Sequence, residues 1–174
     1  PEYCGGLVSE GQRFCPPSAP EQTHEVLAAF REFARKRGVR INLGSIAIDG
    51  PDGKFINRGF MIDPEGDVTG SYDQIHLFDV HLSEGATFRE SDTVHPGKAA
   101  VLHDAGPVRV GHAICYDLRF PGLFRVMAKA GADILCCPAA FTKMTGEAHW
   151  HVLNRARAIE NTRIVVSACA VGPV

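Results

Sequence analysis

The stretch VRVGHAICYDLRFPGLFRVMAKAGADILCCP, residues 108–138, decides the fold class of this chain. Its two ends, "VRVGHAIC" and "DILCCP", are short apolar runs with the length and composition of buried strands. The segment "FRVMAKAGA" between them has a helical pattern, and Gly131 stands where a left-handed helix stop is expected. A helix that connects two such strands predicts a layered α/β domain.

The same alternation continues toward the C-terminus. The segment "GEAHWHVLNRARAIEN" predicts a helix, and "RIVVSACA" is the strand that follows it. One face of this helix carries apolar residues, which are Val152, Leu153, Ala156 and Ile159. No internal repeat or low-complexity linker interrupts the chain, so we expect one domain over residues 1–174.

The N-terminal half has a different organisation. Ser18 and Glu21 form a capping-box pattern, which predicts a helix that ends just before Gly38. The runs "VRINLGSIAI", "KFINRGFMI" and "VTGSY" follow, separated by Gly, Pro and Asp turns, and predict an antiparallel meander. Residues 73–98 lack clear periodicity, so we expect a long functional loop with some short helix.

Composition and charge narrow the class of protein. The formal net charge is -2 and the basic residues are scattered, which argues against a nucleic-acid partner. No run approaches the roughly eighteen apolar residues of a membrane-spanning helix, and we expect a cytoplasmic location. The 6 cysteines include no C-x-x-C pair and fit a reducing compartment.

Cys115 ends an apolar strand, and the residues after it turn toward a helix. At such an elbow the thiol projects from the sheet edge, and the next backbone N–H groups point toward a developing oxyanion. The alternative is an ordinary buried thiol, which is the commoner role of a cysteine at the end of a strand. Position alone leaves both interpretations open.

Several motifs together resemble the nitrilase, or carbon–nitrogen hydrolase, superfamily. They are "PEYC", "YDQIHLFDV", "TFRESDTVHPG", "ICYDLRFPGL" and "GADILCCPAAFTKMTGEAHWHVLNRARAIEN", and they span nearly the whole chain in the family's order. The branch that they resemble most includes omega-amidase and deaminated glutathione amidase. The resemblance implies an αββα sandwich of the two-sheet, four-layer type, here a single partial domain that we expect to be incomplete at both termini.

The resemblance also assigns roles to individual residues. It implies that Glu2 in "PEYC" is the general base, Cys115 in "CYDLRFP" is the nucleophile and Glu90 in "FRES" is an assisting carboxylate. The family's lysine belongs to a Tyr-x-Lys-x-His-Leu-Phe motif. Here the segment reads "YDQIHLF", so Gln74 occupies the lysine position.

The chemistry explains why the lysine matters. A thiol attacks an amide as its thiolate, so a carboxylate such as Glu2 takes the proton. A lysine ammonium favours the thiolate and stabilises the oxyanion together with the N–H of Tyr116. A Gln side chain donates a hydrogen bond but brings no charge, so we expect impaired activity. Lys143 is a candidate for a replacing cation, and a solvated surface charge is its other interpretation.

Other polar residues receive alternative interpretations. Arg119 is predicted either to bind an acidic substrate end or to form a structural ion pair, with Asp117 as one candidate. His76 is predicted to give a supporting hydrogen bond. His149 and His151 face different directions on a helix, and Cys136-Cys137 lies in an apolar strand, so we expect no metal and no organic cofactor.

These observations predict hydrolysis of a small linear amide to an acid and ammonia through a thioester on Cys115. Omega-amides of 2-oxo acids or deaminated glutathione are the expected substrates by resemblance. We also expect a homodimer or higher homo-oligomer through the helices of "FRVMAKAGA" and "HWHVLNRARAIEN". The alternative is a catalytically silent binding or scaffold protein that keeps the pocket but lacks the lysine.

Overall fold

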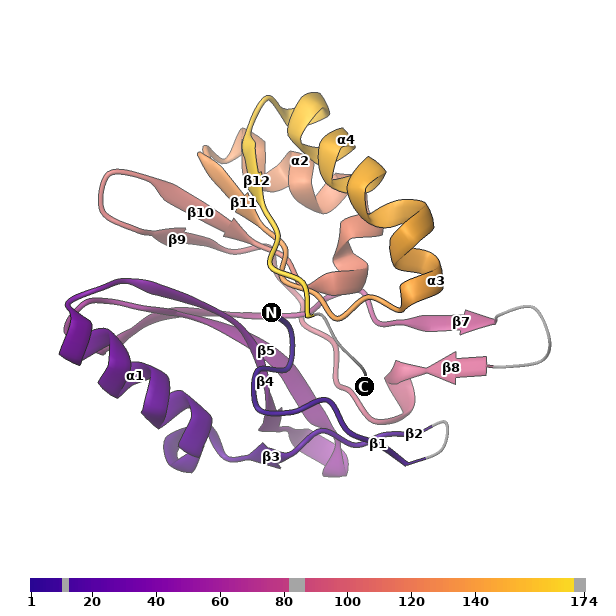
Figure 1. Ribbon diagram of the computed structural model, residues 1–174, viewed down its shortest axis with the longest axis horizontal. Coiled ribbons are helices and arrows are strands. Elements are labelled where there is room, and N and C mark those ends of the chain that lie inside the picture. Colours follow the sequence, from indigo (N-terminus) through magenta and orange to yellow (C-terminus); the bar gives the residue numbers. More distant parts are fainter. Residues whose placement is uncertain (11–12, 82–86, 171–174) are drawn as a thin grey trace.

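The computed structural model describes residues 1–10, 13–81 and 87–170, and it places two sheets between helices (Figure 1). One sheet has the strand order β3-β4-β5-β6, and the other has the order β12-β11-β10-β9. Helix α1 covers the outer face of the first sheet, while α2 and α4 cover the outer face of the second (Figure 1). The layers therefore run α, β, β, α, and the predicted fold class is confirmed.

The first sheet contains the predicted meander. Strands β4 (Ile41–Asp49), β5 (Phe55–Ile62) and β6 (Val68–Asp73) pair antiparallel in sequence order. β3 (Ser18–Ala19) pairs parallel to β4 at the edge. Branched and aromatic residues fill these strands, and the turns between them contain Gly, Pro and Asp, which matches the sequence signal.

Helix α1 (Glu25–Arg37) buries its apolar stripe against this sheet. It ends at Gly38, whose φ of 62° is left-handed, as predicted. The predicted start was wrong, because the Ser18 hydroxyl donates to Asp49 rather than capping a helix. Pairing of β3 with β4 satisfies the backbone there, and after a 3₁₀ turn (Glu21–Thr23) the helix begins at Glu25.

The second sheet contains the strand-helix-strand unit predicted from residues 108–138. Its strands are β9 (Leu102–Asp104), β10 (Arg109–His112), β11 (Ile134–Cys136) and β12 (Ile164–Val166), and β10, β11 and β12 are parallel. Helices α2 (Pro121–Lys129) and α4 (His151–Asn161) are its cover. The short helix α3 (Lys143–Thr145) and a π-helical turn (Gly146–Trp150) lead into α4.

The two sheets approach closely because glycines face imidazole rings. A Cβ atom added at Gly59 would lie 2.3 Å from Cε1 of His112, and one added at Gly70 would lie 2.4 Å from Nδ1 of His103. His112 is fully buried, and its Nε2 lies 3.3 Å from the carbonyl oxygen of Gly44 on β4. This contact layer fixes the distance between the sheets, and so it fixes the place of the residues at their ends.

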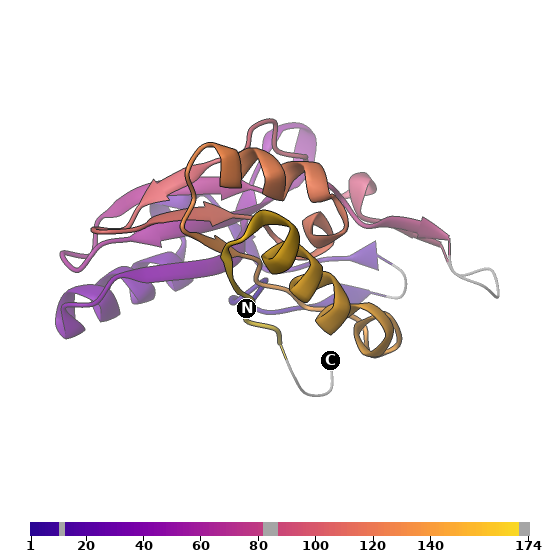
Figure 2. The same cartoon turned by 90° about the horizontal axis from the view of Figure 1, so that it is seen from above.

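The segment expected to be a long loop, residues 73–98, contains more regular secondary structure than predicted. It contains the antiparallel pair β7 (Asp79–His81) and β8 (Thr87–Arg89), followed by a 3₁₀ turn (Glu90–Asp92). Residues 82–86 of that segment lie outside the described residues. β7 and β8 extend away from the two four-stranded sheets in both views (Figures 1 and 2). A further short antiparallel pair is formed by β1 (Ser9–Glu10) and β2 (Arg13–Phe14).

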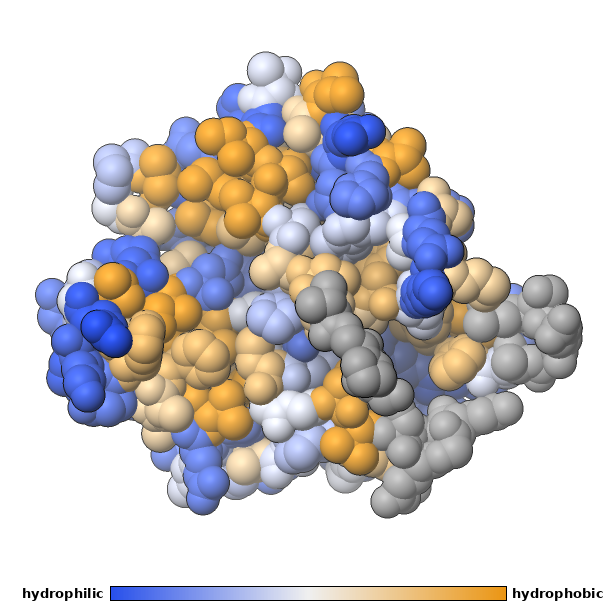
Figure 3. Space-filling view, in the orientation of Figure 1, coloured by the Kyte–Doolittle hydropathy of each residue, from blue (hydrophilic) through white to orange (hydrophobic). Residues whose placement is uncertain are grey.

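The second sheet and its helices expose several large apolar side chains. Figure 3 shows hydrophobic residues gathered over β12, where Ile164 and Val166 are 63% and 50% exposed. Val126 of α2 and Ile159 of α4 are exposed as well. Within the described ranges, no helix has the length and apolar character needed to cross a membrane.

Candidate active site

Cys115 lies three residues beyond the end of β10, at the first position of a 3₁₀ turn (Cys115–Arg119). Its φ of 46° is left-handed, a conformation that is strained for a residue with a side chain. The N–H of Cys115 donates to the carbonyl of Pro138 at 2.8 Å, which ties the turn to the end of β11. The sheet edge therefore holds the elbow that the sequence predicts, with the backbone strain that such elbows store.

Glu2 lies beside this thiol, although it stands 113 positions earlier in the chain. Its carboxyl group is hydrogen-bonded with the Cys115 thiol. The other contacts come from Asn57 Nδ2 at 2.9 Å and the N–H of Ala140 at 2.8 Å. Glu2 is only 6% exposed, and burial raises the pKa of its carboxyl group above the usual value. The predicted base and nucleophile are in contact.

The electrostatics of the thiol oppose its ionisation. Burial raises the pKa of the Cys115 thiol well above its ordinary value, and the nearby Glu2 carboxylate raises it further. The N–H of Ala140 acts in the opposite direction by donating a hydrogen bond. Within the described part of the chain, Glu2 forms no ion pair, so no cation compensates for these effects.

Gln74 lies just after β6, and its amide is buried between the two sheets. Its Oε1 accepts from Asn57 Nδ2 at 2.9 Å, the same amide nitrogen that donates to Glu2. Its Nε2 donates to the carbonyls of His76 and Ile114 at 3.0 and 3.3 Å. The lysine position is therefore adjacent to the Glu2–Cys115 pair, and both donors of Gln74 are engaged with the backbone.

Glu90 lies at the start of the 3₁₀ turn that follows β8. Its Oε2 accepts from the N–H of Phe78 at 2.6 Å, and its Oε1 accepts from the Tyr3 hydroxyl at 3.2 Å. Burial, and then the neighbouring Glu2 carboxylate, raise the pKa of Glu90 to about 8. Glu90 is thus close enough to Glu2 for the two charges to interact, as the predicted pair of carboxylates requires.

Asp117 is the polar hub that supports this arrangement. It is fully buried, and its Oδ2 accepts from the Tyr72 hydroxyl at 2.8 Å and the Ile114 N–H at 2.9 Å. Its Oδ1 accepts from the N–H of His76 at 3.0 Å and lies 2.7 Å from Nδ1 of that ring. One carboxylate therefore joins the segment around Gln74 to the Cys115 elbow.

The partner of Asp117 is thus His76, and the alternative in which Arg119 forms a structural ion pair with Asp117 is wrong. Asp117 is fully buried, whereas Arg119, two residues later in the same turn, lines the cavity. The supporting hydrogen bond predicted for His76 is present. The His76 ring also stacks on Phe120, with ring centroids 3.7 Å apart.

The predicted site residues surround one cavity of about 670 Å³. Its lining includes all six of them, Glu2, Gln74, Glu90, Cys115, Tyr116 and Arg119, together with aromatic residues such as Phe78, Phe88 and Phe141. Lys143, the candidate replacing cation, does not belong to the lining: its side chain is 90% exposed, and its Nζ lies 4.0 Å from Glu147. Its surface interpretation is the one that fits.

Sequence reasoning missed Asn57, Ala140 and the hub role of Asp117. Asn57 gave a signal, because it is a polar residue inside the apolar strand "KFINRGFMI" and such a residue needs a buried partner. Ala140 gave none, since its contribution is a backbone N–H whose direction depends on the turn after β11. Asp117 stood next to the nucleophile, but its acceptor pattern depends on residues from two sheets.

Comparison with known proteins supplies the family. Residues 1–173 match the family described as Carbon-nitrogen hydrolase. The chain belongs to this family. A relative named deaminated glutathione amidase from Yersinia enterocolitica is 46% identical over 146 residues, which cover 82% of this chain and 51% of that protein. A namesake from Synechocystis is 39% identical over 160 residues, or 87% of this chain and 59% of that protein. This carbon–nitrogen hydrolase chain therefore spans about half the length of these curated relatives.

Solved structures agree with this carbon–nitrogen hydrolase assignment. The NitFhit protein of C. elegans superimposes with a TM-score of 0.80 at 38% identity, over 86% of this chain and 37% of that one. A Saccharomyces cerevisiae member of branch 10 of the nitrilase superfamily gives a TM-score of 0.78 at 28% identity, over 90% and 55%. The αββα sandwich is thus the nitrilase fold, as predicted.

Proposed function

We propose that this chain belongs to an amidase that hydrolyses a small linear amide through a thioester on Cys115. The observation that carries the proposal is the Glu2–Cys115 hydrogen bond at the floor of a largely apolar cavity. Relatives named deaminated glutathione amidase support amide carbon–nitrogen bond hydrolysis as the reaction class. The products are a carboxylic acid and ammonia.

In the proposed first step, Glu2 takes the thiol proton while Sγ of Cys115 bonds to the amide carbonyl carbon. The carbon–nitrogen bond then breaks, and the protonated Glu2 delivers its proton to the departing ammonia. In the second step Glu2 takes a proton from water, whose oxygen bonds to the thioester carbon. The carbon–sulfur bond then breaks, the acid leaves, and Glu2 returns the proton to Sγ of Cys115. Glu90, whose pKa is raised by the nearby Glu2, is the proposed assisting carboxyl group of the site.

Gln74 is the residue that we propose lowers the rate of this mechanism. The high pKa of the buried thiol needs a nearby cation, and Gln74 provides none. Its Nε2 already donates to two carbonyls, so stabilising an oxyanion would require breaking those bonds. Removal of one oxyanion donor typically costs about a hundred- to a thousand-fold in rate. We therefore propose impaired hydrolysis in the chain as it stands.

A second candidate function is a catalytically silent protein that binds an amide in the same cavity. The observation that favours it is the raised pKa of the Cys115 thiol, which burial and the Glu2 carboxylate cause and which keeps the thiol protonated. The candidates differ in one measurable product, because a silent protein binds an amide without forming an acyl adduct on Cys115.

The proposed substrate carries a carboxylate at the end away from its amide. Arg119 supports this, because it lines the cavity and has no carboxylate within ion-pair distance in the described part of the chain. A guanidinium pairs with a carboxylate through two parallel hydrogen bonds. Tyr116 provides the adjoining wall and the backbone N–H of the proposed oxyanion site. Omega-amides of 2-oxo acids and deaminated glutathione both fit this class.

The deciding experiment restores the cation. We expect Gln74→Lys to increase ammonia release from succinamate by about a hundred-fold or more. Gln74→Met is the matched control, because it fills similar space without charge, and we expect no increase from it. Mass spectrometry of the Gln74→Lys protein should reveal an acyl group on Cys115. A variant that folds, binds succinamate and gains neither activity nor adduct would support the silent protein instead.

We also propose a homodimer whose interface includes α2 and α4. Val126, Val152 and Ile159 on these helices are all more than half exposed, which supports burial against a second copy. Light scattering after size-exclusion chromatography tests this, and a monomeric mass at micromolar concentration would contradict it. The 6 free thiols support a reducing compartment, and we propose the cytoplasm.

A further inference from the structure

The Arg119 guanidinium is held at the cavity wall by three side chains. Its Cζ lies 5.6 Å from the ring centre of Tyr116 and 5.6 Å from that of Phe141, so the guanidinium makes a cation–π contact with each ring. The third contact is polar: Nη1 and Nη2 each lie 3.3 Å from Nδ1 of His149. A long, otherwise mobile side chain thereby has a defined place.

The polar contact has a specific geometry. Because both terminal nitrogens are equally distant from one imidazole nitrogen, His149 lies at the end of the guanidinium fork. A guanidinium only donates hydrogen bonds, so Nδ1 of His149 is the acceptor in this contact. The side edge of the guanidinium, with Nε and one Nη, remains available for a carboxylate.

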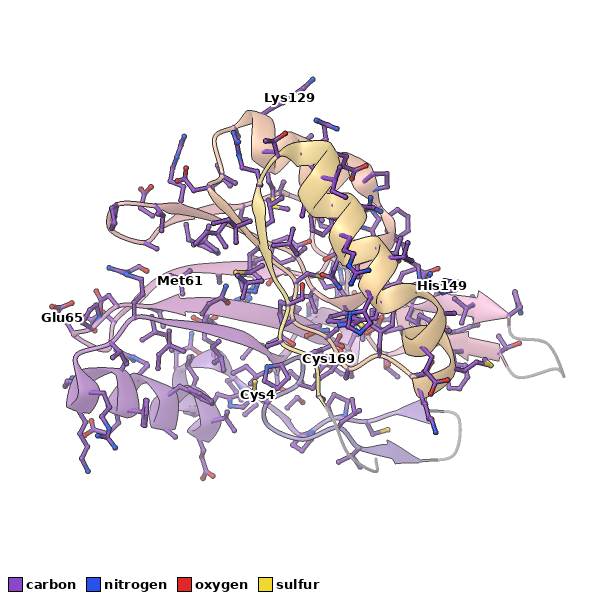
Figure 4. All side chains as sticks on the ribbon, turned by 45° about the horizontal axis from the view of Figure 1, so that its top comes forward. Cys4, Met61, Glu65, Lys129, His149 and Cys169 are labelled. Atoms are coloured by element: carbon purple, nitrogen blue, oxygen red, sulfur yellow. The ribbon has the colours of Figure 1, made fainter. Side chains whose placement is uncertain are left out.

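The position of His149 depends on an irregular helix. It lies in the π-helical turn Gly146–Trp150, where the chain leads into α4 (Figure 4). Such turns are rare and are frequently found at functional sites. The ring of the next residue, Trp150, packs on the ring of Phe141, with centroids 5.0 Å apart. This turn therefore supports Phe141, the aromatic contact of Arg119, and also carries His149, its polar contact.

We propose that His149 is a positioning residue that fixes Arg119 for recognition of the substrate carboxylate. The inference rests on the proposed function, in which Arg119 binds that carboxylate, and it adds the residue that selects acidic over neutral amides. His149 itself touches neither the amide nor Cys115. Its loss should therefore weaken binding of an acidic amide and leave binding of a neutral amide of equal length unchanged.

The test measures binding of two four-carbon amides, succinamate and butyramide, by calorimetry. A Cys115→Ala background keeps both amides intact. We expect the parent to prefer succinamate by about tenfold or more, the gain of one charge-assisted pair. His149→Phe keeps the ring but removes the acceptor, and it should lower this preference about fivefold. His149→Asn keeps an acceptor atom the same number of bonds from the backbone, so it should retain most of the preference for succinamate.

His151→Phe is the matched control, because His151 is also exposed but forms no hydrogen bond with Arg119. Arg119→Gln should abolish the preference. If Arg119→Gln abolishes it and His149→Phe does not change it, the proposed role of Arg119 stands and the inference about His149 is wrong. If the parent shows no preference for succinamate, the role of Arg119 fails and the inference fails with it. A uniform loss of both ligands in His149→Phe also refutes the positioning role.

Discussion

His112 should make the stability of this protein depend on pH in a way that one substitution removes. The imidazole is fully buried between the sheets and stacks on Tyr72, with ring centroids 5.6 Å apart. Burial, together with the nearby His103, lowers its pKa from 6.5 to about 3. The unfolded chain therefore binds a proton at this position below pH 6.5, while the folded protein does not until near pH 3.

The sign and the size of the effect follow from this difference. Since the folded pKa is lowered, the stability contribution is present above pH 6.5 and declines as the pH falls toward 3. Each pH unit within this interval costs about 1.4 kcal/mol. Between pH 8 and pH 5, the His112 side chain alone should therefore lower the free energy of unfolding by about 2 kcal/mol.

Urea unfolding at pH 8, 6.5 and 5 measures this contribution in the wild type and in His112→Gln. The glutamine amide nitrogen can still reach the carbonyl of Gly44, but the side chain does not titrate. We expect the variant to be less stable at pH 8, because it loses ring packing, and to lose about 2 kcal/mol less than the wild type between pH 8 and pH 5. His151→Gln, at an exposed histidine, is the control. Equal losses in wild type and His112→Gln would refute the reasoning.

Three further outcomes are expected. Gly59→Ala should lower the free energy of unfolding by about 2 to 4 kcal/mol in thermal denaturation, because its Cβ would lie 2.3 Å from the His112 ring and the sheets would have to separate. Glu90→Gln should become more stable relative to the wild type as the pH rises from 5 to 7.5. The folded pKa of Glu90 is about 8, so the stability of the wild type declines over that range. Solvent screening reduces the difference that urea unfolding should measure to about 1 to 2 kcal/mol. Asp117→Asn should cost about 2 to 4 kcal/mol, since one amide oxygen cannot accept all the hydrogen bonds of the carboxylate, and it should abolish any ammonia release gained by Gln74→Lys.

Local patterns predicted the elements whose causes are local. The end of α1 at Gly38 depends on the freedom of one glycine to adopt a positive φ, and the β4–β6 meander depends on short apolar runs separated by turn residues. The start of α1 was mispredicted because Ser18 had two possible hydrogen-bond partners, and the one that it uses, Asp49, lies 31 residues away. Such a choice depends on pairing between distant strands.

By itself, the sequence determined a layered α/β domain and the elbow at Cys115. Through the family resemblance of its motifs it also implied the αββα class and the positions of Glu2, Glu90 and Gln74, the last in place of a lysine. Motif order and strand-helix periodicity are properties of the chain, so they need no coordinates. The tertiary structure decided that Asn57 and Ala140 hold Glu2, that Asp117 pairs with His76 instead of Arg119, and that His149 meets Arg119. Those contacts join residues from different layers, and a hydrogen bond needs a distance and a direction that only the packing of the layers provides.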